Sequence, residues 1–325
     1  MSQPSALRLV VLDDYQRAAS RFGRWDTIPG DVSVESIEDH IDDRAELAGR
    51  LADADVVVAM RERTTIDAPL LDMLPALRLL VTTGPTNAAI DVAAAVERGV
   101  VVCGTGGYVT PTSELTWALI LAAARRVPNE HAAIRAGGWQ HTIGTELAGR
   151  TLGLLGLGRI GQLVARVGIA FGMHVIAWSE HLDPELARSV GVTAVERSEL
   201  FERSDVLSIH LVLSERSVGA VGERELAMMK PTSILVNTSR GPIVDERALV
   251  AAVRDRRIAT AALDVFDAEP LSGDHPLRQL DNVVLTPHLG YVTDGLYRLF
   301  YDEIAEDVAA WVRGAPVRIV PMPSG

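Results

Sequence analysis

Residues 151–161 read TLGLLGLGRIG and are the most informative segment of this chain. They contain the pattern G-x-G-x-x-G at Gly156, Gly158 and Gly161, after an apolar run that suits a strand and before a helical pattern over residues 162–171. In such a turn the first glycine permits a tight bend, the second lets the backbone approach a pyrophosphate, and the third allows close helix–strand packing. The helix N-terminus adds N–H groups and a partial positive charge. The segment therefore predicts a dinucleotide-binding turn rather than an ordinary glycine turn in a βα unit.

Short apolar runs alternate with helical patterns on both sides of this segment. Runs that are apolar on both faces and separated by helices are typical of parallel strands in doubly wound α/β sheets. The earlier runs are Leu7–Leu12, Val56–Met60, Leu79–Thr82 and Val100–Cys103, with helical patterns over Asp43–Asp53 and Ile90–Arg98. The later runs are Thr151–Leu155, His174–Trp178, Val206–His210, Ile234–Asn237, Ala259–Leu263 and Val283–Thr286. The later six match a complete Rossmann sheet, and the earlier series predicts a smaller, flavodoxin-like sheet of four or five strands.

This organisation predicts two α/β domains. The dinucleotide-binding domain is expected over residues 105–289, and a discontinuous substrate domain over residues 1–104 and 290–325. Pro111–Arg126, opened by Thr112 or Ser113 as the N-cap, is expected to form the long helix that joins them. Residues after Gly290 show one further helical pattern, which is too short for a domain and should pack on the first one.

The composition excludes several classes of protein. The 325 residues carry 31 Lys and Arg against 43 Asp and Glu, a formal charge of −12, which argues against nucleic acid or an anionic membrane as the main partner. Cys103 is the only cysteine, so a disulfide scaffold is excluded and a small buried hydrophobe is the expected reading. The sequence contains neither a run of ~18 apolar residues nor a signal h-region, so a soluble cytoplasmic protein is expected.

The residue after the second strand of the dinucleotide domain normally selects the cofactor. That strand ends Ala177-Trp178-Ser179-Glu180, so Ser179 stands 18 residues after Gly161, where an acid would bind the adenosine ribose diol. Serine weakens the NAD signal, but Glu180 would repel the 2′-phosphate of NADP. NAD is therefore the expected cofactor, NADP is left open, and Glu180 is equally well read as a solvated loop residue.

Four successive strands of the later series end in polar residues. They deliver His210, then Arg240, then Asp264 with Glu269, and finally His288 to one edge of the sheet. Ligands of open α/β sheets bind at this edge, outside the carboxyl ends of the strands. An arginine fork can hold a carboxylate, a histidine can exchange a proton near neutral pH, and a neighbouring carboxylate fixes the imidazole tautomer.

Each of these residues also has a structural explanation. Arg240 could be a surface cation, Glu269 a solvated carboxylate and His288 a turn histidine, while His210 and Asp264 could simply close their strands. Their joint arrival at strand ends, downstream of the glycine turn, favours hydride transfer between a nicotinamide and a 2-oxo acid. No cluster of residue types with metal-ligand spacing stands out, so no metal is expected.

These residues resemble the D-isomer-specific 2-hydroxyacid dehydrogenases, including the phosphoglycerate dehydrogenase-like members. The resemblance covers nearly the whole chain. It is carried by the glycine segment, by NTSRGPIVDE at 237–246, by DVF at 264–266 with EPL at 269–271, and by TPH at 286–288. It implies an NAD-dependent oxidoreductase that transfers a hydride between NAD(H) and a small D-2-hydroxy acid or 2-oxo acid, in a cleft between two domains, as a homodimer.

The resemblance also implies a role for particular residues. Arg240 would bind the substrate, His288 would be the acid/base and Glu269 its partner. The remaining implied contacts are Arg159 and Ile160 with the pyrophosphate, Ser179 with the ribose, His210 with the cofactor, Thr238 and Asp264 near the nicotinamide, and Arg61, Gly84, Pro85, Thr86 and Asn87 with the substrate carboxylate. The chain departs from the family pattern at three places. Ser179 replaces an acid, and Pro85-Thr86 replaces a Val-Gly pair, which removes one backbone N–H. Val212 stands after His210-Leu211, where a proline is common.

Other functions remain open at this level. A non-catalytic dinucleotide sensor, as in the dehydrogenase-like corepressors, can keep Arg240, Glu269 and His288. A phosphite dehydrogenase of the same family keeps all three as well. A formate dehydrogenase is the weaker alternative, because those relatives carry Gln in place of Glu269. Phosphoglycerate itself is not supported, since no additional basic cluster for a phosphate is evident.

Overall fold

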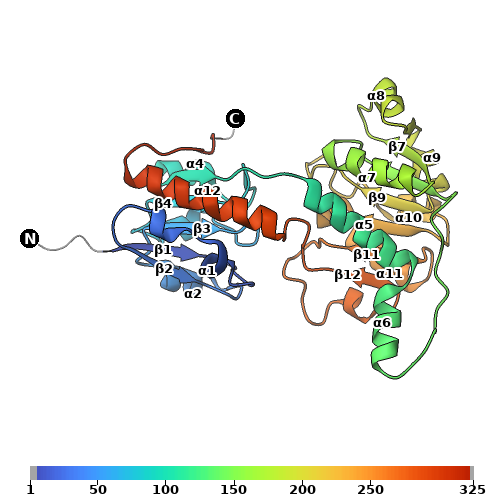
Figure 1. Ribbon diagram of the computed structural model, residues 1–325, viewed down its shortest axis with the longest axis horizontal. Helices are drawn as coiled ribbons and strands as arrows, with labels where there is room; N and C mark the ends of the chain where they lie inside the picture. The colour runs from blue at the N-terminus through green and yellow to red at the C-terminus, as the bar shows by residue number, and fades with distance from the viewer. Residues whose placement is uncertain (1–5, 323–325) are drawn as a thin grey trace, which may run out of the picture. The chain divides into compact units, whose positions relative to one another are not determined.

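The computed structural model describes residues 6–322, which divide into two compact units. Unit 1 contains the chain up to Tyr108 and from Thr293 onward, and unit 2 is the continuous stretch Val109–Val292 (Figure 1). The predicted boundaries, after residue 104 and before residue 290, lie four and three residues from these positions. Among residues 6–322, no helix combines the length and apolarity needed to cross a membrane.

Unit 1 is built on a parallel sheet, and within its described residues the strand order is β2-β1-β3-β4-β5. The strands are β1 (Leu7–Val11), β2 (Val32–Ser36), β3 (Val56–Ala59), β4 (Leu79–Thr82) and β5 (Val101–Gly104). The helices are α1 (Ala18–Phe22), η1 (Trp25–Thr27), α2 (Arg44–Leu51), α3 (Ala68–Leu71), α4 (Val92–Glu97) and α12 (Asp294–Val312). This order is the flavodoxin-like one, with its switch point between β1 and β3.

Helices cover both faces of this sheet. The helices α2, α3 and α4 pack on one face, with Leu47, Leu70 and Ala95 in a shared apolar core. On the other face α12 contacts β4 and α1, and Figure 1 shows it running across the sheet in red. Its Phe300 and Tyr301 are almost completely buried. Helix α12 therefore belongs to unit 1, the same unit as the first strand, β1.

Two further features concern β5, the segment that pairs with it and its buried cysteine. The segment after α12 pairs antiparallel with β5, through the N–H of Val320 to the carbonyl of Val102 at 2.9 Å. Arg318 anchors that segment, because its Nε donates to the carboxylate of Asp307 at 3.0 Å. Cys103 is fully buried in β5, and burial raises the pKa of its thiol to about 12. This confirms its reading as a small buried hydrophobe.

All of residues 109–292 are described, and in unit 2 they form a seven-stranded parallel sheet of order β12-β11-β10-β9-β6-β7-β8. The strands are β6 (Thr151–Leu155), β7 (His174–Trp178), β8 (Thr193–Ala194), β9 (Val206–Ile209), β10 (Ile234–Asn237), β11 (Thr260–Leu263) and β12 (Val283–Leu285). The helices are α5 (Thr110–Ala124), α6 (Val127–Arg135), α7 (Arg159–Ala170), α8 (Pro184–Ser189), α9 (Arg197–Arg203), α10 (Glu223–Met228), η2 (Gly241–Ile243), α11 (Glu246–Arg254) and η3 (Pro276–Gln279).

Alternate residues of each central strand enter different apolar cores. Leu152 and Leu154 of β6 pack in the core that includes α5 and α7, whereas Leu155 packs in the core that includes α9 and α11. Helices on both faces explain why these strands are apolar throughout. The expected class, two doubly wound parallel-sheet domains with one Rossmann sheet, is confirmed.

The structure corrects several local expectations. Strand β2 was not predicted, and neither was β8, so the later series has seven strands rather than six. The long helix begins at Thr110 after Val109, which makes no side-chain cap, so neither Thr112 nor Ser113 is the N-cap. The hydroxyl of Ser113 instead donates to the carbonyl of Thr110 within the first turn, at 2.7 Å.

Candidate active site

The glycine turn lies between β6 and α7, and its three glycines have different surroundings. Gly156 has φ +104°, and a Cβ there would lie 2.7 Å from the carbonyl oxygen of His210. A Cβ on Gly161 would lie 2.3 Å from the carbonyl oxygen of Gly156. A Cβ on Gly158 would meet no protein atom within 4 Å. Folding therefore requires Gly156 and Gly161, whereas Gly158 leaves open space beside the N-terminus of α7, where Arg159 and Ile160 begin the helix.

The turn sits at the switch point of the sheet, because β6 lies between β7 and β9. Ser179 follows β7 and His210 follows β9, so both residues reach the edge that carries the turn. The Nε2 atom of His210 lies 3.0 Å from the hydroxyl of Ser208. Desolvation lowers the pKa of His210 to about 4, so the ring is neutral at physiological pH. Glu180 is exposed and lies 3.8 Å from Arg216.

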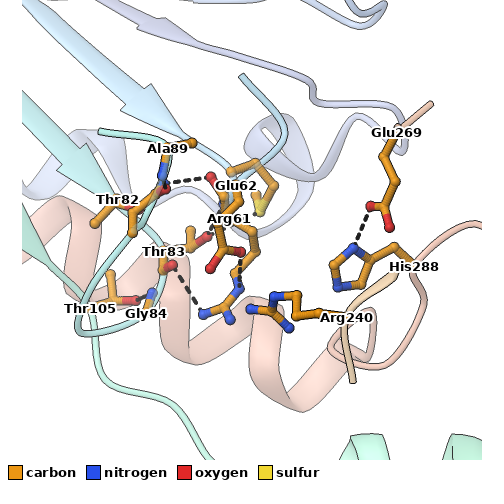
Figure 2. Close-up of polar contacts among 12 residues, drawn as sticks. Arg61, Glu62, Thr82, Thr83, Gly84, Ala89, Thr105, Arg240, Glu269 and His288 are labelled. Atoms are coloured by element: carbon orange, nitrogen blue, oxygen red, sulfur yellow. Dashed lines mark hydrogen bonds and ion pairs between the residues drawn. The ribbon is translucent and has the colours of Figure 1, made fainter. Parts of the chain in front are cut away.

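A short contact joins two of the candidate catalytic groups, Glu269 and His288. The Oε2 atom of Glu269 lies 2.6 Å from Nδ1 of His288. Figure 2 shows the two side chains pointing toward each other. The other oxygen, Oε1, accepts the N–H of Phe266 at 2.9 Å. A carboxylate beside Nδ1 makes that nitrogen the donor of the neutral ring, so Nε2 carries the lone pair. The couple is therefore arranged for proton exchange at Nε2.

A buried carboxylate, Asp264, fixes the turn that carries His288. It accepts the hydroxyl of Thr286 at 2.6 Å and the N–H groups of Leu289 and Gly290 at 2.7 and 2.9 Å. His288 has φ +53°, and its N–H donates to the carbonyl of Asp264 at 2.9 Å. Burial raises the pKa of the Asp264 carboxyl, and these hydrogen bonds oppose that shift. The carboxylate oxygens of Asp264 thus hold the backbone of the turn that carries His288.

Arg240 follows β10 in a segment that its neighbours hold on both sides. The side-chain amide of Asn237 donates to the carbonyl of Arg240 at 2.9 Å, and the hydroxyl of Ser239 donates to the carbonyl of Leu211. The next residue, Gly241, has no room for a side chain, because a Cβ would lie 2.0 Å from the carbonyl carbon of Phe266. The arginine segment therefore rests directly on the backbone that leads to Glu269.

These groups meet because of the parallel topology. Arg240, Glu269 and His288 follow β10, β11 and β12, which are neighbours in the sheet and run in the same direction. Thr238 reaches the same edge, where its hydroxyl lies 2.7 Å from that of Thr116 in α5. Unit 2 thus brings a guanidinium and an imidazole–carboxylate couple to the edge that carries the glycine turn.

In unit 1, hydrogen bonds join the loop after β3 to the loop after β4. Arg61 has φ +54°, and its N–H donates to the hydroxyl of Thr83 at 2.8 Å. A guanidinium N–H of Arg61 also reaches the carbonyl of Thr83, at 3.4 Å (Figure 2). Gly84 has φ +93°, and a Cβ there would lie 2.1 Å from Nη1 of Arg61. The N–H of Gly84 donates to the hydroxyl of Thr105 at 2.8 Å.

The other residues of this loop divide into exposed and buried ones. Pro85 and Thr86 are exposed, whereas Asn87 is buried. The side-chain amide of Asn87 donates to the carbonyl of Arg61 at 2.6 Å and to the hydroxyl of Thr82 at 2.9 Å. Asn87 therefore fastens the two loops together, a structural task that sequence reasoning did not assign to it.

A second histidine–carboxylate couple was also missed from the sequence. Nε2 of His275 lies 2.9 Å from Oε1 of Glu246, although 29 residues separate them. The only local signals were an acid at the start of a helix and a histidine before a proline, and both are common. Within residues 6–322, no group of three His, Cys, Asp or Glu side chains is placed to hold a metal ion.

Comparison with known proteins identifies the class. The family model described as "D-isomer specific 2-hydroxyacid dehydrogenase, NAD binding domain" matches residues 117–290. A glyoxylate reductase of Aeropyrum pernix is 44% identical over 259 residues, which are 77% of each chain. A D-3-phosphoglycerate dehydrogenase of Archaeoglobus fulgidus is 38% identical over 80% of this chain, but the match spans only 50% of that relative. A solved phosphoglycerate oxidoreductase of Vibrio cholerae superposes with TM-score 0.91 at 36% identity, over 95% of this chain and 100% of that one.

Fold and site together define a dinucleotide-dependent oxidoreductase. More specifically, the chain belongs to the D-isomer-specific 2-hydroxyacid dehydrogenases, and unit 2 contains the NAD-binding domain of that family. The expected family, the enzyme class and NAD as cofactor are confirmed.

The glycine turn provides a matched pair of variants. We expect Gly161→Ala to lower the Tm of unfolding by several degrees, because its Cβ would clash with the Gly156 carbonyl. We expect Gly158→Ala to keep the wild-type Tm but to raise the Kd for NADH at least ~10-fold, because the methyl group occupies the approach to the pyrophosphate. Thermal unfolding and NADH fluorescence titration measure both. Unchanged affinity in Gly158→Ala would place the cofactor elsewhere.

His210 should make folding sensitive to acid. Its pKa is about 4 in the fold against an ordinary value of 6.5, so between these pH values only the unfolded chain takes up the proton. Stability should therefore fall as the pH drops from 6.5 towards 4. We expect the free energy of unfolding of His210→Gln to fall less steeply over this window, as measured by urea denaturation at several pH values. Equal slopes would show that the folded histidine titrates normally.

Proposed function

We propose that this chain catalyses NADH-linked reduction of a small 2-oxo acid to the D-2-hydroxy acid, and the reverse oxidation. The observation that carries this proposal is the 2.6 Å contact between Glu269 and Nδ1 of His288, at the sheet edge that also carries Arg240 and the glycine turn. A proton donor, a carboxylate-binding cation and a dinucleotide turn are the groups that this reaction needs.

Each group has one task in this mechanism. When bound, NADH would supply the hydride for the carbonyl carbon of the substrate. Nε2 of His288 donates the proton that converts the carbonyl oxygen into a hydroxyl. Arg240 binds the substrate carboxylate as a fork and polarises the adjacent carbonyl. Glu269 orients the ring of His288 and stabilises its protonated, imidazolium form until the proton is transferred. In the direction of oxidation, neutral His288 takes the hydroxyl proton.

We assign the cofactor contacts to residues at the same edge. The glycine turn with Arg159 and Ile160 would bind the pyrophosphate, Ser179 the adenosine ribose, and His210 would pack beside the turn as a neutral ring. Thr238 and Asp264 would border the nicotinamide end. The hydrogen bonds of Asp264 to the turn of residues 286–290 support an indirect part, in which it holds His288 in place.

We assign substrate binding in unit 1 to the loops of residues 61 and 84–86. The left-handed conformation of Arg61, a β3-end residue, is the kind of backbone strain that clusters at functional sites. Because the N–H of Gly84 donates to Thr105 and Pro85 has none, Arg61 and the exposed Thr86 are the groups that this loop pair offers a carboxylate. Unit 1 is thus the substrate domain in this proposal.

A homodimer is part of the same proposal. The α6 helix and the segment after it expose large apolar side chains: Ile134 is 54% exposed, Trp139 73% and Ile143 96%. Large apolar side chains exposed along one segment are typical of a surface that another protein covers.

Replacing His288 tests the proposed chemistry. We expect His288→Asn to lower kcat for reduction of glyoxylate, or of the fastest member of a 2-oxo acid panel, by ~10²–10⁴-fold. The Kd for NADH should stay within about twofold, because the glycine turn is untouched. Stopped-flow absorbance and fluorescence titration measure the two quantities. A variant with undiminished kcat would remove His288 from the reaction, and a wild type that binds NADH but turns over no 2-oxo acid would favour a sensor.

Ser179 provides a test of cofactor choice. We expect Ser179→Asp to raise the ratio of kcat/KM for NADH over NADPH by ~10-fold or more, because a carboxylate accepts both ribose hydroxyls and repels a 2′-phosphate. Ser189→Asp, which adds the same charge at the end of α8, is the control and should leave the ratio unchanged. An equal ratio in Ser179→Asp and wild type would show that this residue does not face the ribose.

A further inference from the structure

The Glu246–His275 couple lies outside the proposed catalytic groups and has a defined protonation pattern. Nδ1 of His275 accepts the N–H of Leu277 at 3.3 Å, which caps η3. Nε2 lies 2.9 Å from Oε1 of Glu246, and the two side chains are only 17% and 24% exposed. An accepting Nδ1 requires the proton on Nε2, so Nε2–H donates to Glu246. The ring uses one nitrogen for the cap and the other for the carboxylate.

Glu246 bridges both ends of the segment that carries Glu269. It is the first residue of α11, and its Oε2 accepts the N–H of Asp267 at 3.4 Å while Oε1 accepts His275. Residues 267 and 275 thus attach to one side chain, and Glu269 lies between them. The guanidinium of Arg278 also holds this segment, by donating to the carbonyls of Leu271 and Ser272 at 2.7 Å.

Glu269, Glu246 and Gly241 all contact the backbone at Phe266 and Asp267. The N–H of Phe266 donates to Oε1 of Glu269 at 2.9 Å, and the N–H of Asp267 donates to Glu246. The backbone of Gly241 packs against the carbonyl of Phe266, with no room for a Cβ. A displacement of the backbone at Phe266 and Asp267 would therefore move the carboxylate that orients His288 and the backbone that follows Arg240.

Other acidic side chains lie beside the couple, so the donor at His275 offsets a concentration of negative charge. Asp245, Glu246 and Asp267 lie close together: burial and the charges of Glu246 and Asp245 raise the pKa of Asp267, and His275 opposes this. Asp245 is occupied as the N-cap of α11, where it accepts the N–H of Ala248 at 3.0 Å. Without a donor at residue 275, Oε1 of Glu246 would lose its hydrogen bond beside other acids. We then expect the segment to move away from α11.

We infer that Glu246 and His275 are positioning residues for hydride transfer, because together they clip segment 266–275 to α11 and set the place of Glu269 and Arg240. This inference rests on the proposed function of those two residues and of His288. The couple does not bind the cofactor or the substrate in this scheme. Its loss should lower kcat, while affinity for NADH remains.

Two substitutions of His275 distinguish its hydrogen bond to Glu246 from its N-cap of η3. Asn has an oxygen where histidine has Nδ1, so His275→Asn keeps an N-cap for η3 and loses the donor to Glu246. Gln reaches the place of Nε2, so His275→Gln keeps the donor and loses the cap. We expect His275→Asn to lower kcat ~10-fold or more, with the Kd for NADH within about twofold, and His275→Gln to stay close to wild type. Steady-state kinetics, NADH titration and Tm are measured on all variants.

Glu246→Ala removes the carboxylate that accepts from His275 and leaves the His275 cap of η3 in place. If the two residues act as one unit, the Glu246→Ala, His275→Asn double variant should be no slower than the slower single variant. Additive losses, full activity of His275→Asn, or equal losses in His275→Asn and His275→Gln would each overturn the positioning role. The His288→Asn variant separates the two proposals: retained kcat there overturns the proposed function, whereas its loss beside an active His275→Asn overturns only the positioning role.

Discussion

The buried carboxylate of Asp264 is the constraint on which the site in unit 2 depends. A charge removed from water is tolerated only when donors surround it, and here a hydroxyl and two backbone N–H groups do so. All three donors belong to residues 286–290, so satisfying the carboxylate also shapes the turn after β12. That turn holds His288 in a left-handed conformation, which costs free energy unless its surroundings impose it. The place of the imidazole is thus decided by a neighbouring strand.

The same dependence extends through backbone contacts. Glu269 reaches His288 from the segment after β11, and the Phe266–Asp267 peptide within that segment also supports Gly241. The backbone at Phe266 therefore holds both the arginine segment and the glutamate, and the side chain of Glu269 extends this support to His288. Unit 1 uses a comparable device, in which Asn87 and Thr83 fasten the two loops beside Arg61.

Much of the fold could be predicted because interior parallel strands are apolar on both faces. The strands β6, β7 and β10 have the predicted bounds, since helices cover both sides of them. The missed strands are edges of their sheets: β2 is only half-buried, and β8 has two residues. Neither needs a continuous apolar run, so neither has a periodic signal. The cap of α5 was missed because Thr and Ser also occur inside helices, where they bond to the preceding turn.

By itself the sequence determined the class of fold, the dinucleotide turn and the kinds of polar group that end each strand. These follow from local pattern, because strand, turn and helix are set by neighbouring residues. The family resemblance implied that Glu269 partners His288, but only the tertiary structure supplied the geometry of their contact. It alone paired Glu246 with His275 and Asp264 with the turn of residues 286–290. These partners lie on separate loops, some 19 to 29 residues apart in the chain. Their contacts depend on strand register and loop conformation, which no local pattern encodes.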